Sequence, residues 1–89
     1  MPRGTEPLSY AIFRLFEDGE ARCAADVVRE LKPAYGRHKL LTERDVDEVM
    51  TTAKENGLLD EAAAELDDGR LRISFSLSRY GYEMVKRYL

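Results

Sequence analysis

Apolar residues recur along the first part of this chain with the period of an α-helix. The first set predicts a helix that begins at Leu8 and is ended by Asp18 and Gly19. The members of this set share one helical face and are Leu8, Ile12, Leu15 and Phe16.

A second set with the same period predicts a helix over residues 24 to 31. Its members are Ala24, Val27, Val28 and Leu31. Pro33 leaves two alternatives, because proline removes a backbone donor and crowds the preceding turn. The helix either stops near Leu31 or continues with a kink to Tyr35. Residues 21 to 23, just before this helix, are a candidate short strand.

A third helix has the clearest start signal in the chain. Thr42 is a favourable N-cap, Asp45 stands where a capping box carries its acid, and Asn56 with Gly57 supplies the stop. The apolar face consists of Val46, Val49, Met50 and Ala53, with Val49 expected to be buried at its centre. The outward residues are Arg44, Asp47, Glu48, Thr51 and Glu55.

Residues 71 to 77 alternate strictly between apolar and polar, which is typical of a half-buried strand. The apolar members are Leu71, Ile73, Phe75 and Leu77. The partner strand is expected at residues 59 to 66. Asp68 and Gly69 between them suit a two-residue turn, because both central positions of a type I′ turn need positive φ.

Ser78 can cap a last helix, and the residues expected to face inward there are Tyr80 or Gly81, Met84, Val85 and Tyr88. The pattern therefore predicts an α+β fold that is mainly helical, with a small antiparallel hairpin. The predicted order is helix, short strand, helix, helix, strand, strand, helix. A chain of 89 residues has room for one core, so residues 1 to 89 are expected to form a single domain. Residues 1 to 6, with Pro2 and Gly4, are expected to be a flexible arm.

Two short segments, in this order of elements, carry a resemblance to a known superfamily. The segment from Ala53 to Leu59 resembles the end of the third helix in many repressors, where a Gly-Leu pair leads the chain into a hairpin, or wing. The segment from Phe75 to Gly81 resembles the passage from the last wing strand into the C-terminal helix. The chain thus resembles the winged helix-turn-helix superfamily, in particular small bacterial or archaeal repressors of the multiple-antibiotic-resistance and phenolic-acid-repressor kinds.

The resemblance implies a transcriptional regulator that binds double-stranded DNA. The helix over residues 42 to 56 would enter the major groove, and the hairpin would touch the minor groove. The candidate DNA-binding residues are Arg37, His38 and Lys39 in the loop before that helix, Arg44 and Thr51 on its outward face, Arg70 and Arg72 on the hairpin, and Arg79 at the start of the last helix.

The charge of the chain keeps an alternative open. The net charge is -3, the pI is about 5.2, and the helix over residues 42 to 56 is acidic, whereas DNA affinity depends on Lys and Arg. The alternative is a winged helix that serves as a protein-protein interaction module and binds no DNA. A homodimer is expected for the DNA-binding protein, and a protein partner could also bind through the third or last helix. One continuous stripe of the basic residues would favour DNA.

The sequence predicts no catalytic site, cofactor or metal. His38 has no nucleophile or carboxylate pair at motif spacing, and one His with one Cys falls short of a zinc ligand set. Cys23 is expected in the core. No apolar run approaches the roughly 18 residues that span a bilayer, so the expected location is the cytoplasm, with no membrane contact.

Overall fold

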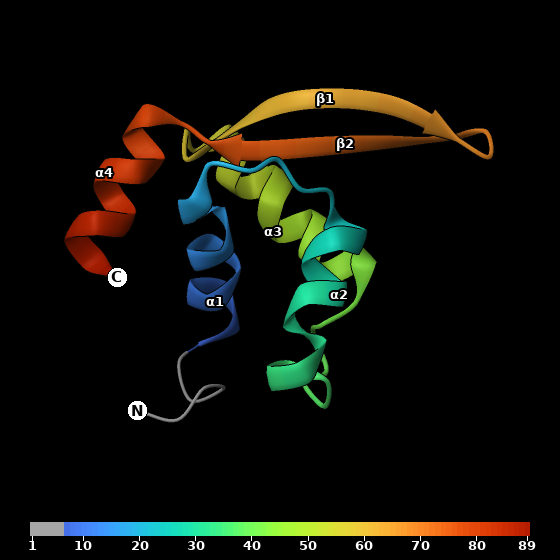
Figure 1. Ribbon diagram of the computed structural model, residues 1–89, viewed down its shortest axis with the longest axis horizontal. Helices are drawn as coiled ribbons and strands as arrows, with labels where there is room; N and C mark the ends of the chain where they lie inside the picture. The colour runs from blue at the N-terminus through green and yellow to red at the C-terminus, as the bar shows by residue number, and fades with distance from the viewer. Residues whose placement is uncertain (1–6) are drawn as a thin grey trace.

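The computed structural model describes residues 7 to 89, which contain four α-helices and a two-stranded antiparallel sheet (Figure 1). The predicted flexible arm at residues 1 to 6 lies outside the described part. The elements in order are α1 (Leu8–Leu15), the 3-10 turn η1 (Phe16–Asp18), α2 (Ala24–Tyr35), α3 (Glu43–Glu55), β1 (Leu59–Asp67), β2 (Arg70–Leu77) and α4 (Arg79–Tyr88). The predicted α+β class and the order of its main elements are confirmed.

The hairpin turn forms as the sequence predicts. Asp68 has a φ of 55° and Gly69 a φ of 76°, the positive values that the two central positions of such a turn require. Pairing runs from Leu59 opposite Leu77 to Asp67 opposite Arg70, with a register shift between Glu61 and Ala63.

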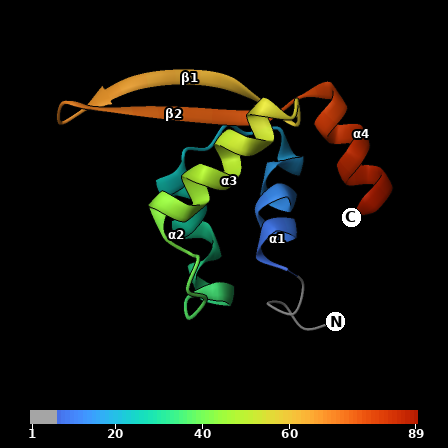
Figure 2. The same ribbon diagram turned by 180° about the vertical axis from the view of Figure 1, so that it is seen from behind.

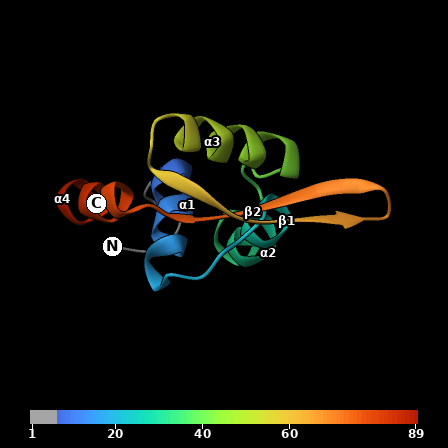
Figure 3. The same cartoon turned by 90° about the horizontal axis from the view of Figure 1, so that it is seen from above.

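The half-buried pattern predicted for β2 holds only near its C-terminal end. Phe75 and Leu77 are buried, but Leu71 is 62% exposed and its cross-strand partner Leu66 is 78% exposed. The physical reason is length, because the hairpin extends past the helices into solvent (Figure 3). An alternating strand buries its apolar side only where another layer covers it.

The predicted short strand is present as a single bridge. The Arg22 N–H donates to Phe75 O at 2.9 Å, and the Phe75 N–H donates to Arg22 O at 2.8 Å. This bridge places the start of α2 under β2 (Figure 1).

The bounds of α2 decide between the two helix ends that Pro33 left open. Helix α2 continues through Pro33 to Tyr35, whose side chain is buried. Residues 36 to 42 then connect α2 to α3. Thr42 caps α3 as predicted, since its side-chain oxygen accepts from the Asp45 N–H at 3.2 Å.

The core lies beneath the buried end of the hairpin and between α1, α2 and α3. Its most completely buried large side chains are Phe16, Ile12, Met50, Leu59, Val27 and Val46. Cys23 is buried, as expected.

Two residues predicted to face inward are more exposed than expected. Val49 packs against the core but is only partly buried, because it borders the groove between α3 and α1. Tyr88 is 65% exposed. Of the two alternatives Tyr80 and Gly81, Gly81 is the buried one, and α4 turns it toward the body together with Val85.

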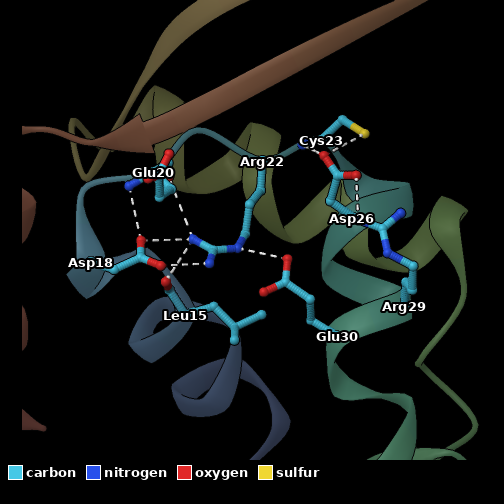
Figure 4. Close-up of polar contacts among 8 residues, drawn as sticks. All are labelled: Leu15, Asp18, Glu20, Arg22, Cys23, Asp26, Arg29 and Glu30. Atoms are coloured by element: carbon cyan, nitrogen blue, oxygen red, sulfur yellow. Dashed lines mark hydrogen bonds and ion pairs between the residues drawn. The ribbon is translucent and has the colours of Figure 1, made fainter.

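The buried side chain of Arg22 connects α1, η1 and α2 (Figure 4). Arg22 donates from Nε to Glu30 Oε2 at 2.8 Å, from Nη2 to Asp18 Oδ2 at 2.7 Å and from Nη1 to Leu15 O at 2.7 Å. Its guanidinium carbon also lies 5.8 Å from the centre of the Phe16 ring. This network fixes the start of α2 relative to α1 and, through the bridge at Arg22, relative to β2.

Candidate nucleic-acid interface

The predicted DNA-binding residues are all exposed, but they lie in separate places. The loop that carries residues 37 to 39 is at the end of the helical layer opposite the hairpin (Figure 1). Arg70 and Arg72 lie on the outer part of β2. Arg79 begins α4, which is at the opposite end of the molecule from the hairpin tip (Figure 3). These elements therefore present no single continuous stripe.

Three of the predicted residues do meet. Arg44, Arg70 and Arg72 line one hollow of about 240 Å³ at the junction of α2, α3 and β2. Arg44 comes from the first turn of α3, which Thr42 starts, and the other two come from β2 just after its turn. The hollow thus depends on the N-cap of α3 and on the hairpin register.

The start of α2 also lines this hollow, through the N-cap Cys23 and the first-turn residues Ala24 and Ala25. Backbone N–H groups in the first turn of a helix have no partner within the helix, and the helix dipole adds partial positive charge there. Helix N-termini bind anions for this reason. The hollow therefore combines guanidinium groups with a helix N-terminus.

Two contacts fix the cap of α2. The Cys23 N–H donates to Asp26 Oδ2 at 3.0 Å, and the Cys23 thiol donates to the same oxygen at 3.2 Å. These bonds lower the pKa of Asp26, the backbone bond from Cys23 being the largest cause. Asp26 therefore stays ionised and uses the N–H of Cys23, which leaves Ala24 and Ala25 as the first-turn donors of α2 that line the hollow.

Acidic side chains offset part of the positive charge. Glu43 and Asp47 also line the hollow, and Arg72 Nε lies 2.9 Å from Asp67 Oδ2. The pKa of Arg72 is raised by its contact with Cys23, whose sulfur is 4.0 Å from Nη1, and by Asp67. Within residues 7 to 89, neither Arg44 nor Arg70 forms an ion pair, so these two arginines are the cations available to an anion.

The loop of residues 37 to 39 is held in shape by its histidine. His38 Nδ1 accepts from the Leu40 N–H at 3.1 Å, and its ring centre is 6.4 Å from that of Tyr35. Arg37 and Lys39 remain exposed. The structure brings none of these three residues to the hollow.

Thr51 also lies outside the hollow, two turns further along the same face of α3 as Arg44. A Lys54 Nζ to Glu61 Oε2 ion pair of 2.5 Å connects α3 to β1 and raises the pKa of Lys54. This pair is an exposed contact between α3 and β1, and Thr51 faces solvent.

Sequence reasoning missed the first turn of α2 as part of the site. The signal was present, because Asp26 stands three residues after Cys23 in the arrangement of a capping box. The prediction placed Cys23 in the core and did not consider the neighbouring N–H groups as donors.

Within residues 7 to 89, the structure contains no cluster of three or more His, Cys, Asp or Glu side chains able to hold a metal ion. The same residues include no helix that is both long and apolar enough to cross a membrane. A scan against models of known protein families gives no match for this sequence, and a search of curated proteins finds no similar one.

Proposed function

We propose that this chain is a winged-helix module that contacts double-stranded DNA and serves as a transcriptional regulator in the cytoplasm. The arrangement of α3 beside a long hairpin supports this, because α3 and the hairpin are the two elements that such modules present to a duplex (Figure 2). The resemblance at residues 53 to 59 and 75 to 81 supports the same proposal.

The observation that carries the proposal is the convergence of arginines and a helix N-terminus on one hollow. Arg44 comes from α3, Arg70 and Arg72 come from β2, and Ala24 and Ala25 in the first turn of α2 line the same hollow. A phosphate on a DNA backbone carries the charge that both features favour. The hollow is therefore the proposed anchor for the backbone.

The surrounding acids define what kind of binding to expect. Glu43, Asp47 and Asp67 lie beside the three arginines, and Glu48 and Glu55 are exposed on α3. Phosphates repel these carboxylates, so a single copy should bind weakly and mainly through backbone contacts. We expect strong dependence on salt and little discrimination between base sequences.

A titration followed by NMR tests the location directly. A mixed-sequence duplex added to isotope-labelled protein at low salt should shift the amide signals of Ala24, Ala25, Arg44 and Arg70. Arg44→Ala should reduce these shifts, whereas Arg37→Ala, which removes the same charge in the distant loop, should leave them unchanged. Shifts confined to the loop of residues 37 to 39 or to α4, or no shifts at all, would overturn the proposed anchor.

The acidic surface of α3 favours a second candidate function, the protein-protein interaction module. Asp45 and Glu48 border a hollow between α1 and α3 that is separate from the arginine hollow. A module of this kind would show no DNA affinity even at low salt. Loss of its protein partner on Glu48→Lys, with no duplex binding by the parent chain, would replace the first function by the second.

A further inference from the structure

One edge of β2 is paired over only part of its length. Near the C-terminal end of the strand, Phe75 exchanges two backbone bonds with Arg22. The chain then leaves this edge at Cys23 and turns into α2 (Figure 1). Apart from the bridge at Arg22, the sheet of the described residues consists of β1 and β2. The stretch of β2 from residue 70 to residue 74 therefore has an open edge on the side away from β1, which we call the outer edge of β2.

The alternation of the strand shows which backbone groups this edge presents. In an antiparallel ladder, residues whose N–H and C=O point toward the partner strand alternate with residues whose groups point away. Phe75 points its groups away from β1, because both bond to Arg22. The register shift lies in β1, so the alternation along β2 is unbroken, and Ile73 and Leu71 point their groups the same way as Phe75. Within residues 7 to 89, no backbone group outside the hairpin bonds to Ile73 or Leu71.

A hollow lies against the outer edge of β2. Leu71 and Ile73 line the same hollow of about 240 Å³ as the three arginines, and the starts of α2 and α3 also line it. The free backbone groups of the edge therefore border open space rather than packed side chains. An unpaired edge of this kind is a template for β-strand addition, in which an extended peptide continues the sheet.

The side chains along the edge alternate between apolar and basic. Leu71 and Ile73 lie on one face of the hairpin, and Arg70 and Arg72 lie on the other. Residues directly opposite each other on neighbouring strands share a face and contact each other. An added strand is therefore complementary when its apolar residues lie opposite Leu71 and Ile73 and its acidic residues lie opposite the two arginines.

The charges of the hollow also favour an acidic strand. Neither Arg70 nor Arg44 forms an ion pair within residues 7 to 89. Three arginines line the hollow against two acids, Glu43 and Asp47. A basic strand would place like charges opposite Arg70 and Arg72, which is unfavourable.

We propose that the outer edge of β2 binds an extended acidic peptide of a partner protein by β-strand addition. The peptide runs antiparallel to β2, as the chain itself does at Arg22, and it alternates apolar and acidic residues. Its apolar residues exchange backbone bonds with Leu71 and Ile73. Its acidic side chains pair with Arg70 and Arg72. This inference goes beyond the proposed DNA anchor and does not depend on it, because its main contacts are backbone groups of β2. The peptide and a duplex use the same arginines, so they exclude each other.

A peptide titration of the full chain, followed by NMR, tests the proposal. The probe is a short peptide of alternating valine and glutamate with both ends blocked, and the control has lysine in place of each glutamate. The glutamate peptide should shift the amide signals of Leu71 and Ile73 and slow their exchange with solvent, because both N–H groups become bonded. The lysine peptide should bind at least about tenfold more weakly.

Two N-methylated peptides separate strand addition from attraction between side chains. Both keep every side chain of the probe. In the first, the N–H groups of the valines are methylated, which removes the donors that face β2, so its dissociation constant should rise by about tenfold or more. In the second, the N–H groups of the glutamates are methylated. These groups face away from β2, so its dissociation constant should stay close to that of the probe.

A matched pair of proline variants tests the same edge from the side of the protein. Leu71→Pro removes an N–H from the outer edge of β2 and should raise the dissociation constant of the probe by about tenfold or more. Leu66→Pro is the control, because Leu66 lies directly opposite Leu71 and its N–H points to the other edge of the hairpin. It should leave the dissociation constant unchanged. Circular dichroism checks that both variants are folded, and the N-methylated peptides test the bond in the unaltered chain.

Three results would each overturn the proposal. They are unchanged amide signals of Leu71 and Ile73 at millimolar peptide, equal binding of the two N-methylated peptides, and equal binding of the glutamate and lysine peptides. A chain that binds the glutamate peptide in these ways but binds no duplex would lose the DNA anchor and keep the peptide site.

Discussion

At the scale of single residues, Arg22 has the largest structural role of any charged side chain described here. It satisfies the Leu15 carbonyl and two carboxylates while its guanidinium lies against the Phe16 ring. Arg22→Ala should therefore destabilise the protein by about 2 to 4 kcal/mol, through lost bonds to charged groups and a cavity beside Phe16. Denaturant titration measures the change.

Arg29→Ala is the control for this prediction. Arg29 also pairs with a carboxylate, Asp26, at 2.9 Å, but its side chain is 69% exposed. Exposed pairs of this kind contribute about 0 to 1 kcal/mol. Similar losses for the two variants would show that the Arg22 network adds nothing beyond a surface ion pair.

Asp18 should make the stability depend on acid pH. Hydrogen bonds from Arg22 and from the Glu20 N–H lower the pKa of Asp18 from its ordinary value of 3.8 to about 2. A carboxylate with a lowered pKa stabilises the fold above its ordinary value, and this contribution is lost as the pH falls through about 2.

Asp18→Asn should accordingly be less stable than the parent chain at neutral pH, and the difference should shrink between pH 3.8 and about 2. Urea titrations over that range measure it. Glu17→Gln, whose ion pair with Arg14 is 3.8 Å long, is the control and should show a smaller difference at every pH. If the difference in unfolding free energy between Asp18→Asn and the parent chain stays constant with pH, Asp18 does not have the lowered pKa given above.

Single residues also show where sequence reasoning succeeds. Thr42 and the Asp68-Gly69 turn act through their own neighbours along the chain, so their caps and φ values follow from local rules. Arg22 binds groups from α1, η1 and α2 at once, and no local pattern around it predicts burial of a cation.

At the scale of elements, α4 approaches the body most closely at Gly81. Gly81 is buried, and a Cβ at this position would overlap the carbonyl oxygen of Leu58. That carbonyl already accepts the Ser78 N–H at 3.0 Å and the Ser78 hydroxyl at 3.1 Å. The contact explains why Gly81, rather than Tyr80, faces inward.

Gly81→Ala should therefore destabilise the protein, although alanine is favoured over glycine in helices by about 1 kcal/mol. Thermal unfolding followed by circular dichroism measures the change. Glu83→Ala, at an exposed position of the same helix, should change stability little. An increase in stability for Gly81→Ala would show that α4 does not approach Leu58 this closely.

Two adjacent residues of helix α3 differ in how deeply they are buried. Met50 is fully buried and Val49 borders the α1 groove. Met50→Ala should cost about 2 to 4 kcal/mol and Val49→Ala about 1 kcal/mol or less. Denaturant titrations that give the reverse order would mean that the faces of α3 are assigned incorrectly.

The existence of each main element followed from periodicity, but the depth of burial did not. Periodicity identifies which side of α3 or β2 is apolar, whereas burial depends on what another element covers. This is why Val49 and Leu71 were predicted to be more buried than they are. The length of the hairpin beyond the helices is a property of the tertiary arrangement.

At the scale of the whole molecule, the candidate site was predictable only in part. Arg44, Arg70 and Arg72 were named from the sequence, yet their meeting with the first turn of α2 depends on contacts between distant segments. The loop of residues 37 to 39 has the same basic character and lies elsewhere (Figure 1). Charge along a sequence does not show which cations share a surface.

The central claim, that the arginine hollow anchors a DNA backbone, is tested most directly by the salt dependence of duplex binding. Each phosphate neutralised on duplex DNA contributes about −0.9 to the slope of log affinity against log salt. The two arginines that form no ion pair, Arg44 and Arg70, predict a slope of about −2 for each copy of the chain, and Arg44→Ala should reduce its magnitude by about 1 per copy. Fluorescence anisotropy with a mixed-sequence duplex measures this, and absence of binding at about 50 mM salt, or a slope that Arg44→Ala leaves unchanged, would contradict the claim.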